Sequence, residues 1–383
     1  MPEELLEPVS VIDVNTDTTQ PQEGIALCLS GGGYRAMLFH LGTLIRLNEI
    51  GLLPKLNRVS SVSGGSVTAA QLGLKWRQLQ FTGGIAQNIS QLVIDPIRAF
   101  GERTIDAKSI LGGIFLPGTV SDKVTKAYRS YLYGDADLQA LPADNEGPRF
   151  VINATNVQTG ALWRFSRPYM GDYKTGRVLA PKTPVAQAVA ASSAFPPVLS
   201  PLLLKLHHAD FEADPKATLQ MPPYTTEVVL SDGGVYDNLG LETAWKRYKS
   251  VLVSDGGGKM PPQQDPKSDW ARHGLRINDI IDNQVRSLRK RQTIEAFKRG
   301  TDHNGTYWGI RSHVKDYSAP IPLSCPEQRT TELAETPTRL KGLSLAYQNR
   351  LINWGYAICA AATETYFPGS VRTEIKFPYP GGV

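Results

Sequence analysis

The sequence is poor in the residues that build disulfide frameworks and metal centres. Its 383 residues include only three cysteines and six histidines. Cys28, Cys325 and Cys359 are odd in number and far apart, so we expect buried thiols rather than disulfides. No cluster of cysteine and histidine has the spacing of a zinc site. These counts argue against a disulfide scaffold and a structural zinc module, and we expect no metal.

Long apolar runs are also missing. No stretch approaches the roughly 18 apolar residues that a membrane-spanning helix needs. The first ten residues, MPEELLEPVS, carry glutamates and no cation, which is the wrong charge for a secretory signal. We therefore expect a cytoplasmic protein.

Neither sign of charge dominates the chain. Lys and Arg total 41 against 36 Asp and Glu, which gives a formal net charge of +5. This mild excess permits contact with an anionic lipid surface without requiring it, and we expect no nucleic-acid partner.

Strand-like and helix-like stretches alternate along the chain, a pattern typical of a parallel sheet covered by helices. Strands are expected at 25–29, 58–62, 150–155, 161–165, 227–230 and 250–253. Long helices are expected at 67–79, 278–299 and 339–366, with a mostly helical cap at 85–133 over one edge of the sheet. Because no repeat or interdomain linker is visible, we predict one domain over 24–366, between tails at 1–23 and 367–383.

The stretch LSGGGYRAMLFHLGTL, residues 29–44, joins a strand-like run to an apolar helix pattern through Gly31, Gly32 and Gly33. A glycine turn that enters a helix presents unpaired N–H groups and the positive end of the helix dipole. The turn therefore predicts an anion site, either for a phosphate or for an oxyanion that forms during a reaction. A purely structural turn is the remaining interpretation.

A nucleotide is one candidate for this anion. Gly31-x-Gly33-x-x-Ala36 fits a dinucleotide fingerprint, which requires an Asp or Glu at the end of the second strand to bind the ribose. The second strand at 58–62 instead runs into SGGS at 63–66 and carries no carboxylate. A P-loop does not fit either, because no Gly-Lys-Ser/Thr follows the glycines.

Ser63 lies in the setting of a nucleophile. A nucleophile elbow, G-x-S-x-G, holds a serine in a strained strand-to-helix turn between very small residues. Here the pattern is Ser61-x-Ser63-x-Gly65, with serine in place of the first glycine. Alone, the match fits a helix-capping serine equally well. Beside an anion-binding turn one strand earlier, it predicts a nucleophile next to an oxyanion hole.

A nucleophilic serine needs a base. The stretch EVVLSDGGVYDNLGLE places Asp232 at the end of an apolar strand, before Gly233 and Gly234. A second Asp-Gly-Gly, at Asp255, also ends a strand, so spacing alone does not choose between them. A Ser–His–Asp triad is a third possibility. The histidines that follow in hydrolase order are His273, His303 and His313, and none of them ends a predicted strand, while His40 lies within the helix pattern after the glycine turn.

The three motifs in this order resemble the patatin-like phospholipase family. The phrases FHLGTLIRLNEIGLL, AVAASSAFPPVLSP and INWGYA extend the resemblance over residues 24–366. It implies a three-layer α/β/α patatin-like (lysophospholipase-like) fold with a mostly parallel central sheet, and a Ser–Asp dyad that uses no cofactor. DGGVYDN matches the family's phrase and DGGGKMP does not, which favours Asp232 over Asp255. Ser30 and Ala36 depart from the family pattern, where many relatives have Asp and Gly.

By this resemblance Ser63 is the nucleophile and Asp232 the base of a lipid acyl hydrolase. The backbone N–H groups of Gly32 and Gly33 form the oxyanion hole, and Arg35 lies near the polar head of a phospholipid or other acyl lipid. Gly31 and Gly64 also belong to this oxyanion and substrate-binding set, and the glycines that support the motifs are Gly65, Gly233 and Gly234. A dyad also requires the carboxylate to take the proton directly, so we expect burial to raise its pKa. The alternatives are a catalytically inactive lipid-binding module and a nucleotide-binding enzyme.

The segment QVRSLRKRQTIEAFKR, residues 284–299, carries six cations and one anion. On a helix, these cations predict either a solvated face or contact with anionic headgroups in a peripheral membrane interaction.

Overall fold

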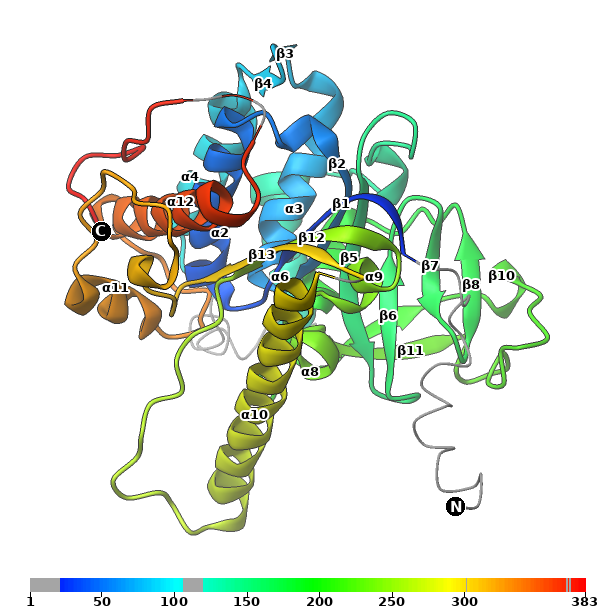
Figure 1. Cartoon of the computed structure of the whole chain (residues 1–383). Coiled ribbons are helices and arrows are strands. Elements are labelled where there is room, and N and C mark those ends of the chain that lie inside the picture. Colours follow the sequence, from blue (N-terminus) through cyan, green and yellow to red (C-terminus); the bar gives the residue numbers. More distant parts are fainter. Residues whose placement is uncertain (1–20, 106–119, 301, 370, 372) are drawn as a thin grey trace, which may run out of the picture.

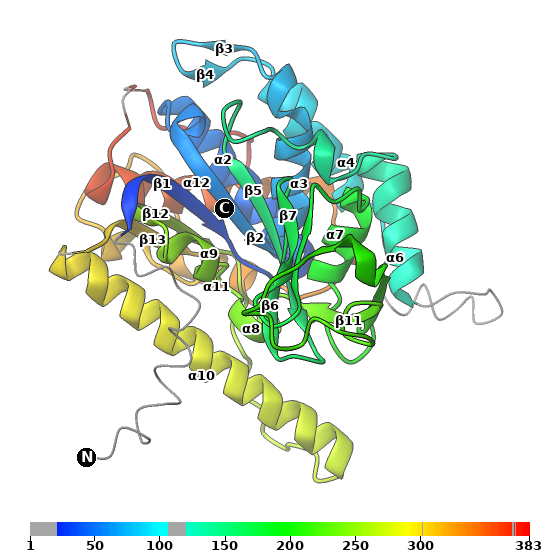
Figure 2. The same ribbon diagram turned by 90° about the vertical axis from the view of Figure 1, so that its right-hand side faces the viewer.

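The computed structural model describes residues 21–105, 120–300, 302–369, 371 and 373–383. Helices cover both faces of an 11-stranded mixed sheet, in three layers (Figures 1 and 2). The strands are β1 Gln22–Leu29, β2 Leu56–Val62, β3 Phe81–Thr82, β4 Ile85–Ala86, β5 Arg149–Asn156, β6 Ala161–Phe165, β7 Tyr169–Asp172, β8 Gly176–Leu179, β9 Leu202–Lys205, β10 Phe211–Glu212, β11 Glu227–Asp232, β12 Tyr248–Asp255 and β13 Asn304–Gly309. The α-helices are α2 Gly33–Glu49, α3 Gly64–Lys75, α4 Asp95–Gly101, α6 Val120–Tyr128, α7 Val185–Ser192, α8 Gly234–Asp237, α9 Glu242–Trp245, α10 Trp270–Arg299, α11 Glu327–Ala334 and α12 Leu345–Tyr366.

Five strands at the centre of the sheet run parallel, in the order β5-β2-β1-β12-β13. All six strands predicted from the sequence are present, and the parallel centre is confirmed. An antiparallel arm, β6-β7-β8-β10, continues the sheet from β5. Of this arm the sequence predicted only β6.

Strand β1 shows how the three layers are held together. Successive side chains of a strand point to opposite faces of the sheet. Leu27 and Leu29 join a large core with α2, α3 and α12, whereas Ala26 and Cys28 join a smaller core with α9 and α10. Burial on both faces explains why this strand is a continuous apolar run in the sequence.

Helix α12 packs along α2 and is buried over most of its length. It begins at Leu345 rather than at the predicted residue 339, because the Ser344 hydroxyl accepts the N–H of Tyr347 and caps the helix. The chain before it passes the start of α2 instead, where the N–H of Tyr34 donates to the carbonyl of Arg339 at 3.0 Å.

The predicted helical cap is only partly helical. Helices α4 and α6 lie in this stretch, each next to a short π-helical turn, at 90–94 and 129–133. Strands β3 and β4 form a separate two-stranded sheet. Residues 106–119 of the cap, and 1–20 of the predicted N-terminal tail, lie outside the described residues.

Helix α10 projects from the body of the molecule (Figures 1 and 2). It begins at Trp270, before the predicted start, because the Asp269 carboxylate accepts the N–H of Arg272 at 3.0 Å and caps it. It ends at Arg299 and is capped by Gly300, whose φ of +64° is left-handed. Within the described ranges, no helix is both long and apolar enough to cross a membrane.

Candidate active site

Ser63 and Asp232 come together because two strands end on the same edge of β5. Strand β2 runs parallel to β5 and pairs with it up to Val62, opposite Asn153. Strand β11 runs antiparallel, and its last residue, Asp232, lies opposite Ala154. Since β6 occupies the other edge of β5 along this stretch, β2 and β11 meet end to end on one edge. The residue after β2 and the last residue of β11 are therefore neighbours.

Ser63 occupies a sharp turn between β2 and α3. Its φ is +51° and its ψ −121°, a conformation that residues other than glycine rarely adopt. Only very small neighbours fit here. A Cβ on Gly64 would overlap the carbonyl oxygen of Gly33, and one on Gly65 would overlap that of Leu29. The side chain of Ser63 makes no capping hydrogen bond to α3, so the turn has the geometry of a nucleophile elbow rather than of a helix cap.

The carboxylate of Asp232 is buried at the end of β11. Its Oδ1 accepts the N–H of Gly234 at 2.7 Å. Burial raises the pKa of Asp232 to about 7, although the Gly234 amide and the Ser63 hydroxyl act to lower it. Oδ2 has no hydrogen-bond partner of ordinary geometry among the described residues. The Ser63 hydroxyl therefore lies next to the carboxylate without full hydrogen-bond alignment.

The glycine turn lies directly against this pair. A Cβ on Gly31 would come within 3.1 Å of the Cβ of Ser63. Gly33 has a φ of +61° that favours glycine. The N–H groups of Gly32, Gly33 and Gly64 donate to no other residue in the described part of the chain. These free donors at the N-termini of α2 and α3 can bind an oxyanion.

Two residues that the sequence analysis did not assign to the site hold its parts together. The hydroxyl of Ser192, the last residue of α7, accepts the N–H of Ser63 at 2.9 Å, and its carbonyl accepts the N–H of Gly233 at 3.3 Å. The carbonyl of Asn238 accepts the N–H of Gly31 at 3.0 Å. Both residues lie in family-like phrases, AVAASSAFPPVLSP and DGGVYDN. The family-like phrases marked these two residues, but the sequence did not show which atoms they would contact.

Arg35 is buried, and its guanidinium binds the protein itself. Nε donates to the carbonyl of Gly256 and Nη2 to the hydroxyl of Thr338, both at 2.9 Å, and Nη1 donates to the carbonyl of Thr336. Burial, with Arg286 nearby, lowers the pKa of Arg35 to about 9. Arg35 therefore ties the start of α2 to two loops, and the geometry gives no support to its predicted contact with a lipid head.

A cavity of about 380 Å³ lies beside the start of α2. Its wall includes Tyr34, Arg35 and Tyr347 together with two exposed cations, Arg339 and Lys341. Its described wall contains no acidic residue. A larger cavity of about 630 Å³ lies between α9 and α10, and none of the predicted catalytic residues lines it.

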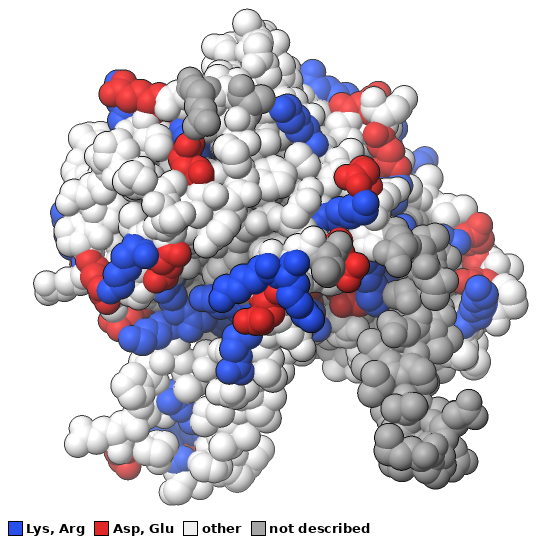
Figure 3. Space-filling model, in the orientation of Figure 1, with Lys and Arg blue, Asp and Glu red and all other residues white. Residues whose placement is uncertain are grey.

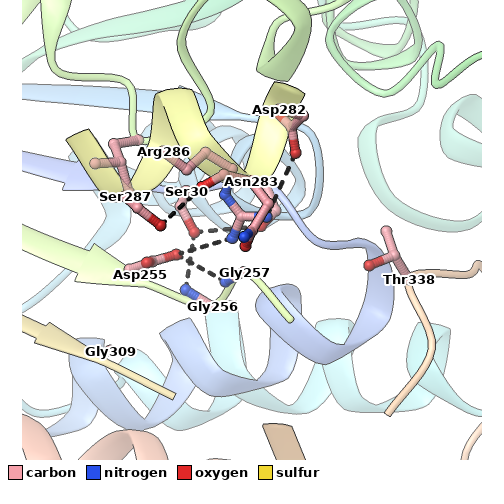
Figure 4. Close-up of polar contacts among 12 residues, drawn as sticks. Ser30, Asp255, Gly256, Gly257, Asp282, Asn283, Arg286, Ser287, Gly309 and Thr338 are labelled. Carbon is pink, nitrogen blue, oxygen red and sulfur yellow. Dashed lines mark hydrogen bonds and ion pairs between the residues drawn. The ribbon is translucent and has the colours of Figure 1, made fainter. Parts of the chain in front are cut away.

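The second Asp-Gly-Gly motif builds a separate network at the end of β12 (Figure 4). Asp255 accepts the hydroxyl of Tyr307 at 2.6 Å and the N–H of Gly257 at 2.8 Å, and it pairs with Arg286 of α10 at 3.8 Å. Burial acts to raise the pKa of Asp255, but Arg286 and the other partners outweigh it and lower the pKa. Asp255 is therefore a charged anchor for α10.

The histidine nearest the glycine turn is buried and neutral. His40 contacts the hydroxyl of Ser254 through Nδ1 at 2.9 Å and the carbonyl of Ser30 through Nε2 at 3.0 Å. Burial lowers the pKa of His40 to about 4. Its role is to pack α2 against β1 and β12.

The other three histidines considered for a triad lie elsewhere. His303 stacks on Trp245 with ring centroids 3.9 Å apart, His313 lies 3.7 Å from Glu327, and His273 is exposed on α10. Throughout the described ranges, none of the four histidines contacts Ser63 or Asp232.

The basic segment 284–299 is not one solvated face, so that prediction is wrong for half of its cations. Arg286 pairs with the end of β12, Arg289 pairs with the buried Asp237 at 3.3 Å, and Lys290 lies 4.6 Å from the centre of an aromatic ring of β13. These three cations anchor α10 to the sheet. The exposed ones are Arg291, Lys298 and Arg299.

Together these features define a three-layer α/β protein with a serine and an aspartate at facing strand ends beside a glycine turn. The model of the family "Patatin-like phospholipase" matches residues 27–245, more than half of the chain. The chain therefore belongs to the patatin-like phospholipase family.

Two solved structures illustrate the shared fold. Human GIVD cytosolic phospholipase A2 is similar with a TM-score of 0.55 and 15% identity, over 93% of this chain and 61% of that one. Its complex with methyl gamma-linolenyl fluorophosphonate is similar with a TM-score of 0.51 and 15% identity, over 89% and 58%. The chain thus spans about three fifths of the length of this relative. Comparison with curated protein sequences gave no match.

Proposed function

We propose that the chain is a lipid acyl hydrolase that cleaves carboxylic ester bonds of phospholipids or other acyl lipids through an acyl-serine intermediate. The observation that carries the proposal is the meeting of β2 and β11 on one edge of β5, which brings Ser63 in its strained turn beside the buried Asp232. Family membership supports the substrate class. So does the lipid-like fluorophosphonate in the complex of human GIVD cytosolic phospholipase A2.

In the acylation step, Asp232 accepts the hydroxyl proton of Ser63 while Oγ attacks the ester carbonyl carbon. With a pKa near 7, this carboxylate is a stronger base than an exposed aspartate. Oδ2, which has no well-aligned partner among the described residues, is the oxygen available for the proton. The N–H groups of Gly32, Gly33 and Gly64 stabilise the tetrahedral oxyanion, by roughly 3 kcal/mol for each donor.

The proton then passes from Asp232 to the leaving oxygen, the alcohol departs, and the acyl group stays on Ser63. In the second half-reaction Asp232 takes a proton from water, which attacks the acyl carbonyl. The fatty acid leaves as the proton returns to the serine. The scheme requires no cofactor.

A fluorophosphonate probe, which reacts covalently with activated serines, tests the assignment of Ser63. We expect wild type to be labelled, Ser63→Ala to remain unlabelled, and Ser193→Ala to keep its labelling as a matched control. Undiminished labelling of Ser63→Ala would refute the assignment. A wild type that binds lipid but takes no label would instead indicate an inactive lipid-binding module. Mass spectrometry of lipid products from wild type and Ser63→Ala identifies the substrate.

A further inference from the structure

We propose that α10 docks the protein on an anionic lipid bilayer by inserting an apolar stripe on its outer face. This proposal concerns a surface outside the active site and does not require Ser63 to be catalytic.

The outer stripe consists of Trp270, Ile277, Ile281, Val285 and Leu288. Their spacing of seven, four, four and three residues places them on one face of a helix. Their exposed fractions are 89%, 41%, 55%, 41% and 49%. A surface helix normally turns such a face toward the core, whereas α10 turns it toward solvent. A contiguous apolar surface of this kind marks an interaction site.

The opposite face of α10 holds the helix to the body. Thr293 is buried there, and Ile294 and Phe297 pack into the smaller core. Arg286 and Lys290 lie on the same side and contact the sheet. Because only the inner face of the C-terminal half anchors the helix, the outer face from Trp270 to Leu288 is left free.

The charge of α10 favours an anionic lipid surface as the occupant. The helix contains eight Lys and Arg and three Asp and Glu, a net charge of +5. Three of these cations, Arg286, Arg289 and Lys290, face the sheet. Arg291, Lys298 and Arg299 are exposed at the C-terminal end, with Glu295 as the exposed anion among them. Figure 3 shows Lys and Arg side chains gathered over the C-terminal end of α10, while its projecting part is mostly uncharged.

An exposed apolar stripe with exposed cations at one end of it is typical of an interfacial helix. Such helices place Trp and aliphatic residues in the bilayer while their cations contact anionic headgroups, and Trp favours the membrane–water boundary. A second copy of the chain is disfavoured as the occupant, because it would bring the exposed cations Arg291, Lys298 and Arg299 of two helices together.

The anchor of α10 also lies close to the proposed oxyanion site. Asp255, which pairs with Arg286, is followed by Gly256, whose N–H donates to the hydroxyl of Ser30 at 2.8 Å (Figure 4). The carbonyl of Gly256 accepts Nε of Arg35. Through Asp255 and Gly256, α10 is therefore connected to Ser30 and Arg35, the residues on either side of the glycine turn.

Vesicle sedimentation of the full chain tests the proposal. The Ser63→Ala background prevents hydrolysis of the vesicles. We expect binding to vesicles that contain phosphatidylserine, weaker binding to phosphatidylcholine alone, and a loss of about tenfold in Ile281→Ser. Leu275→Ser is the matched control. Leu275 is 44% exposed on the same helix but lies off the stripe, so this variant should bind as before.

Tryptophan fluorescence gives a second measurement at the tip of the stripe. Trp270 is 89% exposed, whereas four of the other five tryptophans are at most 6% exposed and Trp245 is partly buried. Lipids with brominated acyl chains should quench the emission of the bound protein. Trp270→Phe should remove most of this quenching.

Equal binding by Ile281→Ser and its parent would overturn the proposal, as would an equal loss in Leu275→Ser. A concentration-dependent dimer in analytical ultracentrifugation that Ile281→Ser abolishes would overturn it in favour of a second copy. Stripe-dependent binding in a protein whose Ser63 takes no fluorophosphonate would contradict the proposed function and leave this proposal standing.

Discussion

At the scale of single residues, the proposed dyad depends on one carboxylate that is buried away from water. Burial raises the pKa of Asp232 to about 7, so between its ordinary value and 7 the folded protein holds a proton that the unfolded chain releases. This group therefore adds stability as the pH falls from above 7 toward the ordinary aspartate range. Catalysis has the opposite pH dependence, because only the ionised carboxylate accepts a proton and it predominates above the pKa.

The pH dependence of esterase activity tests whether ionisation of Asp232 controls catalysis. We expect kcat/KM for a soluble p-nitrophenyl ester to rise with pH and to level off above about 7, since kcat/KM reports the free enzyme's base. A profile that stays flat down to the ordinary pKa of aspartate would contradict Asp232 as the base.

Ser192 acts as a positioning residue, since its hydroxyl accepts the N–H of Ser63. Ser192→Ala leaves this buried N–H unpaired and loosens the turn. We expect kcat to fall about tenfold, which corresponds to an activation free energy higher by about 1.4 kcal/mol, with KM little changed. Ser193→Ala, whose hydroxyl lies 3.4 Å from that of Tyr128, is the control and should keep normal kcat. Equal loss in both variants would indicate a general packing effect.

We expect Arg339 and Lys341, the two exposed cations of the smaller cavity, to bind the head of a phospholipid. Arg35 is not expected to bind it, because its donors already bond to the protein. Arg339→Gln with Lys341→Gln should raise KM for an anionic phospholipid several-fold and leave a neutral p-nitrophenyl ester unchanged. Steady-state kinetics on both substrates checks this. Equal effects on both would mean that the cavity does not bind the head.

Single residues were also where prediction from sequence was most uneven. Ser63 and Asp232 could be singled out from the sequence, because the motifs are local and their small neighbours are visible there. The structure places the two residues side by side, and their catalytic roles stay a prediction. The contacts of Arg35 could not be predicted, since its partners Gly256, Thr336 and Thr338 lie more than 200 residues away.

At the scale of elements, α10 is the helix for which the prediction of a solvated basic face was wrong. The cluster of cations was visible, but two of them pair with Asp255 and Asp237, and a third makes a cation–π contact with an aromatic ring of β13. Only the folded sheet brings these partners to the helix. The helix start was missed because Gly274 weakens the helical pattern before residue 278.

Removing the Asp255 anchor tests how α10 is held. Asp255→Asn leaves Arg286 without its buried partner, and we expect the free energy of unfolding at neutral pH to fall by about 3 kcal/mol. Because the pKa of Asp255 is lowered, the difference from wild type should shrink as the pH falls through the folded pKa. Denaturant unfolding measures it. Asp282→Asn, which removes an exposed partner of Arg286, should cost much less, and similar losses would contradict the anchor.

The short strands were also not predicted from the sequence. Strands β7, β8 and β9 have four residues each and β10 has two, which is too few to show a clear alternation. Strand β13 begins with Asn-Gly, which reads as a turn in the sequence. Each of these strands is defined by its neighbour in the sheet rather than by its own residues.

At the scale of the whole molecule, the sheet brings the motifs together. Alternating strands and helices predicted the layers, and the resemblance implied the family fold. What neither showed is that β11 runs antiparallel and meets β2 end to end beside β5. That arrangement depends on the antiparallel arm and on β9, whose pairing with β11 extends the sheet there.

Pre-steady-state release of p-nitrophenol from a medium-chain ester tests the dyad of Ser63 and Asp232 most directly. Wild type should show a burst as the acyl-enzyme forms. Asp232→Asn should abolish it, because the change removes the base while it keeps the size of the side chain, and a nucleophile and its base act as a unit. Folded variants with the histidines replaced one at a time should keep the burst rate within about tenfold. These variants are His40→Asn, His273→Ala, His303→Ala and His313→Ala. A burst that survives in Asp232→Asn and disappears in a histidine variant would contradict the dyad and replace it with a triad.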